Sequence, residues 1–197
     1  FSRKGTERII RYAFARAADR KRPRLISATK SNALNYSMVF WDRIFEEVKE
    51  RFPLVQARSV HVDALAALFV LQPQCLEVVV ASNLFGDILT DLGAALLGGI
   101  GVSPSANLNP EGRFPSMFEP VHGSAPDIAG KGIADPIGTF WSIVLMLEHL
   151  HLAAEGARLM AAIESVLGRG DTLTPDLGGT ATTDQVTDRV VAALGEG

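Results

Sequence analysis

The sequence predicts an α/β protein in which a parallel or mixed sheet is flanked by helices. Helical segments alternate with short apolar runs along the chain, and this alternation is typical of α/β folds. The clearest run, Leu76–Ala81, has the length of a strand covered on both faces. With 197 residues, 47% of them hydrophobic, the chain can form a packed core in one domain or in two small lobes.

The first half of the chain contains four segments with apolar residues at helical spacing. We expect them to form helices at Thr6–Ala18, Ser37–Arg51, Val62–Leu71 and Asn83–Leu97. Pro53 and Pro73 follow the second and third, and Gly98-Gly99 closes the fourth. A strand at Leu25–Thr29 completes this half.

The second half begins with a long segment, 98–138, that is rich in Gly, Pro, Ser and Asn. So long an irregular stretch indicates a functional loop system. Three helices are expected after it, near Gly138–Leu152, Glu155–Leu167 and Thr183–Leu194, with a turn-rich connector at Asp171–Gly179. The number of strands is low for a complete doubly wound sheet, which indicates that partner strands are missing.

Composition and charge exclude several classes of protein. The single cysteine excludes an internal disulfide framework and a multi-cysteine zinc site. No apolar run reaches the roughly 18 residues of a membrane-spanning helix, and we expect a cytoplasmic protein without a membrane partner. Residues 1–24 carry a net charge of +7, which we interpret as the solvated face of an amphipathic helix. No aromatic residues accompany these charges in the manner of a nucleic-acid site.

The strongest local pattern is NLFGDILTD, in which Asp87 and Asp91 lie four residues apart on one helix face. Two carboxylates at this spacing repel, and Mg²⁺ or Mn²⁺, which prefer oxygen ligands, would remove the repulsion. The alternative is a pair of solvated helix acids. Because the helix is apolar over most of its circumference, we expect it to be buried. Asp63, at the start of another apolar helix, is a third candidate, or an acid that complements the helix dipole.

Other polar residues lie where α/β proteins usually build their sites. Lys30 directly follows a strand, and Asn32 is a hydrogen-bonding amide or a simple turn residue. The segment Phe118–Pro136 offers glycines, a hydroxyl, a histidine and Asp127, an acid that could accept from a ribose 2′-hydroxyl. A glycine-rich surface loop is the alternative there.

Four motifs resemble the β-decarboxylating dehydrogenases, the family of isopropylmalate, isocitrate, tartrate and D-malate dehydrogenases. They are TKSNAL at 29–34, NLFGDILTDLG at 83–93, PSANLNP at 104–110 and FEPVHGSAPDIAGKGIADP at 118–136. The resemblance covers essentially the whole chain and is strongest for the tartrate and D-malate dehydrogenase branch. It implies an isopropylmalate dehydrogenase-like fold whose N-terminal part is missing here.

The resemblance also implies a chemistry and a set of roles. The family oxidises and decarboxylates a 2-hydroxy acid with NAD and Mg²⁺ or Mn²⁺ as cofactors. Asp87 and Asp91 would be metal ligands from one subunit of a homodimer, and Asp63 would reach the same metal from the partner subunit. Lys30 would be the catalytic lysine. The subunit that contributes Lys30 would also contribute Asp63, which would be a second catalytic residue. The nucleotide would be bound by Asn32, His122, Gly123, Ser124, Ala125, Asp127 and Asp135.

The family layout divides the chain at residue 97. Residues 1–97 would form the dimer-forming lobe with the metal and catalytic residues, and residues 98–197 would complete the nucleotide-binding lobe. The chain departs from the family at Asp135, where asparagine is common, and the substrate-binding arginines and catalytic tyrosine would lie upstream. We therefore expect a fragment that is inactive alone. The alternatives are an isopropylmalate dehydrogenase and a non-catalytic, truncated or regulatory dimerising chain.

Overall fold

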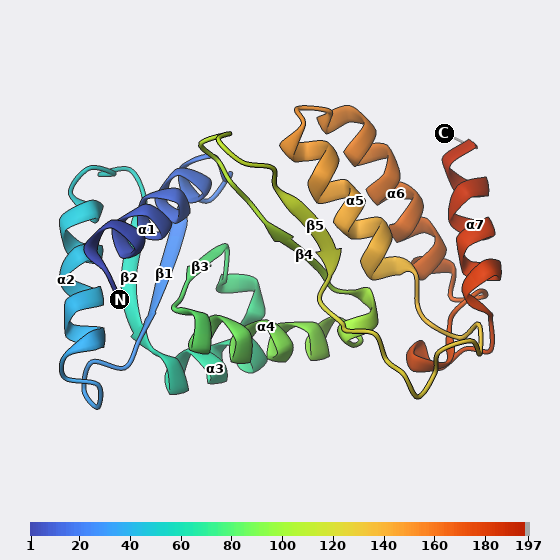
Figure 1. Ribbon diagram of the computed structural model, residues 1–197, viewed down its shortest axis with the longest axis horizontal. Coiled ribbons are helices and arrows are strands. Elements are labelled where there is room, and N and C mark those ends of the chain that lie inside the picture. Colours follow the sequence, from blue (N-terminus) through green and yellow to red (C-terminus); the bar gives the residue numbers. More distant parts are fainter. Residues whose placement is uncertain (196–197) are drawn as a thin grey trace. The chain divides into compact units, whose positions relative to one another are not determined.

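The computed structural model describes residues 1–195, and the chain divides into two compact units, Phe1–Gly93 and Ala94–Gly197 (Figure 1). Each unit has its own hydrophobic core. The α/β class predicted from the sequence is confirmed. Among the described residues, no helix combines the length and the apolarity that crossing a membrane requires.

Three parallel strands form the sheet of the first unit, in the order β2–β1–β3. They are β1 (Arg24–Thr29), β2 (Gln56–His61) and β3 (Val78–Val80). The register of the central pair runs from Arg24 opposite Gln56 to Thr29 opposite His61. Both ends of the two longer strands are therefore level, which brings the residues that follow them to one edge of the sheet.

Strand β2 lies where the sequence predicts no strand. It is an edge strand, and its residues Gln56, Arg58 and Ser59 are exposed to solvent. An edge strand needs little apolar character, because its unpaired side contacts water instead of a neighbouring strand. Strand β3 is shorter than the predicted Leu76–Ala81, although the apolar run marks its position correctly.

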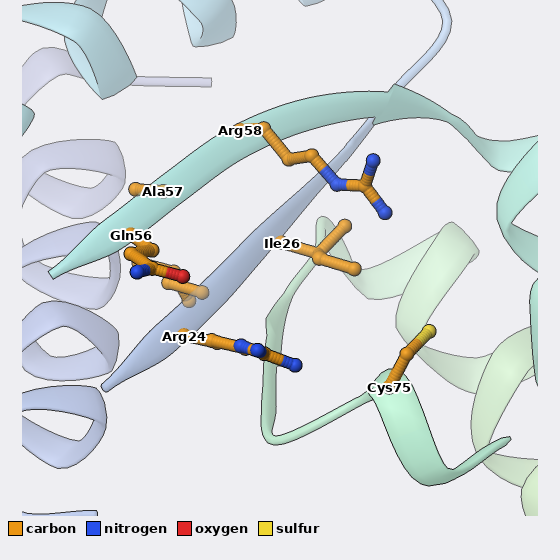
Figure 2. A pocket seen from close by; sticks show the side chains of 7 residues that line it. Arg24, Ile26, Gln56, Ala57, Arg58 and Cys75 are labelled. Atoms are coloured by element: carbon orange, nitrogen blue, oxygen red, sulfur yellow. The ribbon is translucent and has the colours of Figure 1, made fainter. Parts of the chain in front are cut away.

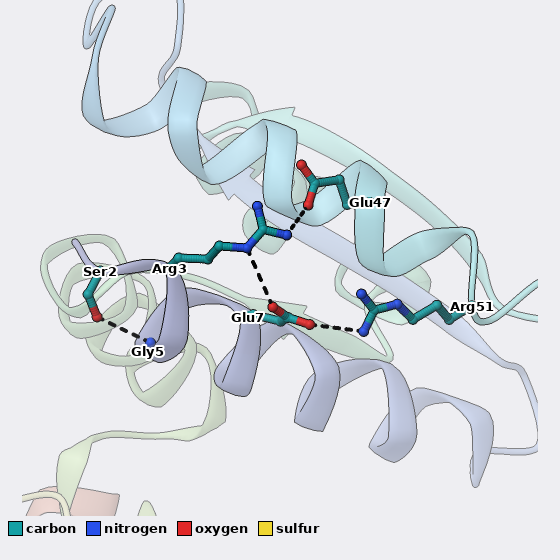
Figure 3. Close-up of polar contacts among 6 residues, drawn as sticks. All are labelled: Ser2, Arg3, Gly5, Glu7, Glu47 and Arg51. Carbon is teal, nitrogen blue, oxygen red and sulfur yellow. Dashed lines mark hydrogen bonds and ion pairs between the residues drawn. The ribbon is translucent and has the colours of Figure 1, made fainter.

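Four helices surround this sheet: α1 (Arg3–Ala18), α2 (Ser37–Lys49), α3 (Val62–Leu71) and α4 (Asn83–Leu97). The bounds of α3 and α4 match the sequence prediction. Helix α1 begins earlier than the predicted Thr6, because the Ser2 hydroxyl accepts a hydrogen bond from the Gly5 N–H at 3.2 Å. Arg3 of α1 forms ion pairs with Glu7 of the same helix and with Glu47 of α2. Arg51, which follows α2, forms an ion pair with Glu7 of α1 (Figure 3).

Helices α1 and α2 cover one face of the sheet and form most of its core. Phe14 of α1 stacks on Phe52 with ring centroids 5.1 Å apart and packs against Phe45 of α2. The Trp41 indole donates to the Ser27 hydroxyl at 2.8 Å, which satisfies a polar group on the buried central strand. Each buried aromatic or aliphatic side chain contributes about 1.5–3 kcal/mol, so this face holds most of the stability of the unit.

The second unit consists of a hairpin and three helices. Strands β4 (Pro104–Asn107) and β5 (Met117–Pro120) pair antiparallel and contact α5 (Ile137–His149). Helix α6 (Ala153–Arg169) packs against both α5 and α7 (Thr183–Gly195). The three predicted helices are confirmed, whereas the hairpin lies inside the segment that the sequence presents as irregular. Its strands have only four residues each, and a proline lies at one end of each strand.

Three short 3₁₀ turns complete the fold: η1 (Pro73–Cys75), η2 (Ile100–Val102) and η3 (Pro175–Leu177). In the second unit, η2 passes very close to the start of α5. A Cβ on Gly138 would lie 2.6 Å from the carbonyl oxygen of Gly101 and 3.1 Å from that of Ser103. Glycine is therefore required at position 138 by backbone contact.

Candidate active site

Lys30 and Asp63 form an ion pair at the carboxyl ends of β1 and β2. Lys30 is the first residue after β1, and Asp63 lies in the first turn of α3, directly after β2. The Lys30 Nζ lies 2.7 Å from Oδ1 of Asp63. The hydrogen bond from Lys30, followed by one from the backbone N–H of Asp63 itself, lowers the pKa of this carboxyl group. The pair lies at the edge of a parallel sheet where α/β proteins bind ligands.

Asp87 and Asp91 lie on α4, and both side chains are exposed. The expectation that this helix is buried is wrong for the single chain. Phe85 and Leu89 pack into the core of the first unit, whereas Leu84 and Ile88 are 65% and 56% exposed.

The two carboxylates of α4 are free to bind a ligand. Neither Asp87 nor Asp91 has an ion pair or a side-chain hydrogen bond within the described part of the chain. Unpaired carboxylate oxygens four residues apart fit the ligand preference of Mg²⁺ or Mn²⁺. Across residues 1–195, no three acidic, histidine or cysteine side chains come close enough together to hold a metal ion. Asp63 is thus not brought to Asp87 and Asp91 within one chain.

Asn32 lies in the exposed turn that follows Lys30. The turn is fixed by the backbone N–H groups of Ala33 and Leu34, which both donate to the carbonyl oxygen of Lys30. A cavity of about 360 Å³ lies beside it, between Leu34, the start of α2 and the start of α4. The turn therefore presents the Asn32 amide to solvent at the same edge of the sheet as Lys30.

The loop between β5 and α5 carries the remaining candidates. Gly123, Ser124 and Asp127 are exposed, and Nδ1 of His122 lies 3.0 Å from the carbonyl oxygen of Gly123. Ala125 has a φ of +41°, a left-handed conformation that non-glycine residues adopt only where the surroundings impose it. Asp127 has no side-chain partner within the described residues and is available to a ligand.

Asp135 differs from these residues because its side chain is buried, at 7% exposure. Its Oδ1 accepts a hydrogen bond from the Ile137 N–H at 2.8 Å, at the first residue of α5. Among residues 1–195, neither its Oδ2 nor the buried hydroxyl of Thr174 makes a hydrogen bond of good geometry, although the nearby Thr174 hydroxyl acts to lower the pKa of the carboxyl group. Burial, with a further contribution from Asp176, raises the pKa of this carboxyl group. The Asp135 side chain therefore caps α5.

Thr183 is a residue that the sequence analysis does not select. Its hydroxyl donates to the carbonyl oxygen of Ala134 at 2.6 Å, and its N–H donates to the carbonyl oxygen of Gly132 at 2.9 Å. The start of α7 thus holds the end of the candidate nucleotide loop. The sequence signal that could have pointed to this helix start is the capping box of Thr182 and Gln185. The Thr182 N–H donates to the Gln185 side chain at 2.9 Å, and the Gln185 N–H donates to the Thr182 hydroxyl at 3.3 Å.

Comparison with known proteins identifies the family. The family model described as isocitrate/isopropylmalate dehydrogenase matches residues 1–190. The chain belongs to the isocitrate/isopropylmalate dehydrogenase family. Within this family, it is 50% identical to a probable tartrate dehydrogenase/decarboxylase of Bacillus subtilis over 194 residues, which are 98% of this chain and 54% of the relative. It is 53% identical over 195 residues to the decarboxylating D-malate dehydrogenase of Escherichia coli, covering 96% of this chain and 54% of that protein.

The isocitrate/isopropylmalate dehydrogenase fold is also found by structural comparison. The isocitrate dehydrogenase of Methylococcus capsulatus superposes with a TM-score of 0.90 at 40% sequence identity, covering 98% of this chain and 57% of that one. The predicted isopropylmalate dehydrogenase-like fold is thereby confirmed. The chain spans about half the length of the curated relatives it matches.

Proposed function

We propose that this chain provides part of the active site of an NAD- and divalent-metal-dependent dehydrogenase. The enzyme would oxidise and decarboxylate a 2-hydroxy dicarboxylic acid, either tartrate or D-malate. The Lys30–Asp63 ion pair carries the proposal, because it joins a potential proton-transfer group to an acid at the ligand-binding edge of a parallel sheet. The names of the relatives, tartrate dehydrogenase/decarboxylase and D-malate dehydrogenase, support the choice of substrate.

The proposed site is shared between two copies of the chain in a homodimer. Asp87 and Asp91 of one subunit would be completed by Asp63 and Lys30 of the other. The absence of a three-acid cluster within the described residues of one chain supports this arrangement. Leu84 and Ile88, which flank Asp87 on the exposed side of α4, are suited to burial against a second subunit.

In the proposed mechanism, Lys30 as the neutral amine would accept the proton of the substrate 2-hydroxyl, NAD would supply the hydride acceptor for the carbon that bears this hydroxyl, and the β-carboxylate would leave as CO₂. Asp63 holds the Lys30 ammonium group in position through their 2.7 Å contact. Asp63, Asp87 and Asp91 would hold a Mg²⁺ or Mn²⁺ ion, which supplies Lewis-acid stabilisation of negative charge on the substrate oxygen. Lys30 would then return its proton to the carbon that lost the carboxylate, which completes the 2-keto product.

The loop between β5 and α5 would bind the adenosine side of NAD. In this arrangement Asp127 accepts from the ribose 2′-hydroxyl and repels the 2′-phosphate of NADP. His122, Gly123, Ser124 and Ala125 line the loop, and Asn32 lies near the nicotinamide. Asp135 contributes by fixing the start of α5, because its side chain accepts from the Ile137 N–H.

The division of the chain into two compact units supports the proposal of two lobes. Residues 1–97 would form the dimer-forming lobe, and residues 98–197 the C-terminal part of the nucleotide-binding lobe. The boundary of the compact units, between Gly93 and Ala94, falls inside α4. Helix α4 therefore carries the acidic pair in one unit and ends in the other.

A chimera tests this function. The N-terminal part of the E. coli D-malate dehydrogenase that this chain does not match is fused in frame before Phe1. NADH formation is measured with D-malate, tartrate and isopropylmalate in the presence of Mn²⁺. We expect turnover of D-malate or tartrate, loss of turnover in the Lys30→Met chimera, and retained turnover in the Asp188→Asn control, which changes an exposed residue of α7. The 197-residue chain alone should show no turnover.

Other outcomes of the same assay identify the alternatives. Because the chimera takes its substrate-binding arginines from the donor enzyme, turnover itself, and not the choice among the three acids, is the readout for this chain. A folded, dimeric chimera that oxidises none of the three acids would favour a non-catalytic, dimerising chain. Turnover that survives Lys30→Met would overturn the role proposed for the lysine.

A further inference from the structure

A second cavity lies at the opposite end of the sheet, where β1 and β2 begin (Figure 2). Its volume is about 310 Å³. Residues of the two strands and of η1 line it: Arg24, Ile26, Gln56, Ala57, Arg58 and Cys75. Strand β1 has six residues at about 3.3 Å each, so this cavity lies roughly 17 Å from Lys30.

The strand register places two arginines on one face of the sheet. Arg58 lies opposite Ile26, and Gln56 lies opposite Arg24. Because paired residues of parallel strands point to the same face, Arg24 and Arg58 are diagonal neighbours around Ile26. In Figure 2, Arg24 and Arg58 lie on either side of Ile26, and both side chains point toward the side where Cys75 lies.

Neither guanidinium group has a counter-ion. Two other arginines near the sheet are paired: Arg22 with Glu77, and Arg51 with Glu7. Within the described part of the chain, the side chains of Arg24 and Arg58 have no ion pair and no hydrogen bond. Glu77, an acid near the start of β3, is already occupied by Arg22. The cavity therefore has an uncompensated positive charge of +2.

We propose that this cavity binds a small oxyanion, either phosphate or a carboxylate-bearing molecule. Guanidinium groups bind both by paired, parallel hydrogen bonds, and two arginines line this cavity. The Gln56 amide can donate a further hydrogen bond, and Ile26, on the same face as the two arginines, provides an apolar surface that strengthens the attraction. Arg20 and Lys21, which precede β1, add to the positive field. This site is separate from the proposed active site and does not depend on it.

Cys75 provides a local measurement, because it is the only cysteine of the chain and lines the cavity. The experiment follows the rate at which the neutral reagent N-ethylmaleimide modifies Cys75 in the 197-residue chain. Phosphate and malonate are titrated separately, with sodium chloride at matched ionic strength as the control salt. A ligand at ten times its dissociation constant leaves about one site in eleven free, so we expect labelling to slow about tenfold.

Variants separate the site from a general effect of charge. Arg24→Gln and Arg58→Gln should lose the protection, and Arg58→Lys should weaken it, because lysine keeps the charge but lacks the planar fork. Arg11→Gln, which removes an exposed charge from α1, should retain full protection. Circular dichroism of each variant verifies folding. If phosphate alone protects Cys75, the ligand is phosphate-like. If malonate alone protects it, the ligand is carboxylate-like.

Three results would overturn the proposal. They are equal labelling rates with and without both anions, unchanged protection in Arg58→Gln, and loss of protection in Arg11→Gln to the same extent as in Arg58→Gln.

Discussion

Lys30 and Asp63 contact each other at 2.7 Å although 33 positions separate them in the sequence. The contact results from the register of two parallel strands, in which Thr29 lies opposite His61. The residues that directly follow the two strands therefore lie close together at one edge of the sheet. Two groups joined in this way enter a shared site together, as a dimer with exchanged catalytic residues requires.

The first prediction concerns the titration of Asp63 when Lys30 is replaced by Met. In the native chain the pKa of Asp63 lies below its ordinary value of 3.8, and Lys30 is the main cause. The ion pair thus contributes to stability above pH 3.8, and the contribution is lost as the pH falls through the lowered pKa. In Lys30→Met the midpoint should rise toward 3.8, as followed by NMR of the side-chain carboxyl. An unchanged Asp63 midpoint would contradict the pairing.

The second prediction concerns metal binding by the dimeric chimera. Asp87→Asn should weaken Mn²⁺ binding by at least about tenfold, or roughly 1.4 kcal/mol, because it removes a charged oxygen ligand. Binding is measured by titration calorimetry on the dimer. Asp19→Asn, which neutralises an exposed acid at the end of α1, serves as the control and should bind Mn²⁺ like the parent protein. The same affinity in Asp87→Asn and its parent would exclude Asp87 as a ligand.

The third prediction concerns the buried carboxyl group of Asp135. Burial raises its pKa, so its ionisation costs stability at neutral pH and the cost disappears below pH 3.8, where the group is protonated in both states. Asp135→Asn keeps the acceptor for the Ile137 N–H and adds a donor near the unpaired Thr174 hydroxyl. The free energy of unfolding should rise by on the order of 1 kcal/mol at pH 7.

Urea denaturation between pH 7 and pH 4 measures this effect. The gain of Asp135→Asn should shrink as the pH falls toward 3.8, whereas the exposed control Asp188→Asn should change little throughout. A variant that is less stable than the parent at pH 7 would contradict this prediction. It would mean that neighbouring groups stabilise the ionised carboxyl group of Asp135.

The fourth prediction compares two glycines in buried helical positions. A Cβ on Gly138 would meet two backbone carbonyl oxygens, at 2.6 and 3.1 Å, so Gly138→Ala should cost about 1–3 kcal/mol of stability. A Cβ on Gly156 would lie no closer than 3.6 Å to its neighbours. Gly156→Ala should therefore stabilise the protein by up to about 1 kcal/mol, because alanine favours helix. Thermal unfolding measures both, and a neutral Gly138→Ala would refute the close approach.

The fifth prediction concerns the attachment of the candidate nucleotide loop to α7. Thr183→Val removes the hydroxyl that donates to Ala134 and should cost about 1 kcal/mol. Amide hydrogen exchange of residues 128–136 should become faster, since the loop loses one of its two bonds to α7. Thr183→Ser keeps the hydroxyl and should exchange at the parent rate. Equal protection in both variants would show that the backbone bond to Gly132 is sufficient.

Much of this protein can be predicted from local sequence. The helices α3 and α4 follow from apolar periodicity bounded by proline and glycine, and the family follows from motifs such as those around Lys30 and Asp87. The polar edge strand β2 and the four-residue strands of the hairpin do not, because their pairing partners, rather than their own residues, stabilise them.

The sequence by itself determined which residues we propose to carry the chemistry: the lysine after β1, the acidic pair on α4 and the acid in the candidate nucleotide loop. Only the tertiary structure decided which residues lie beside them and how far each is exposed. It paired Lys30 with Asp63, left Asp87 and Asp91 exposed, buried Asp135 at a helix start and placed Arg24 beside Arg58 without a counter-ion. Strand register and helix packing set these relationships, and both depend on contacts between residues far apart in the chain.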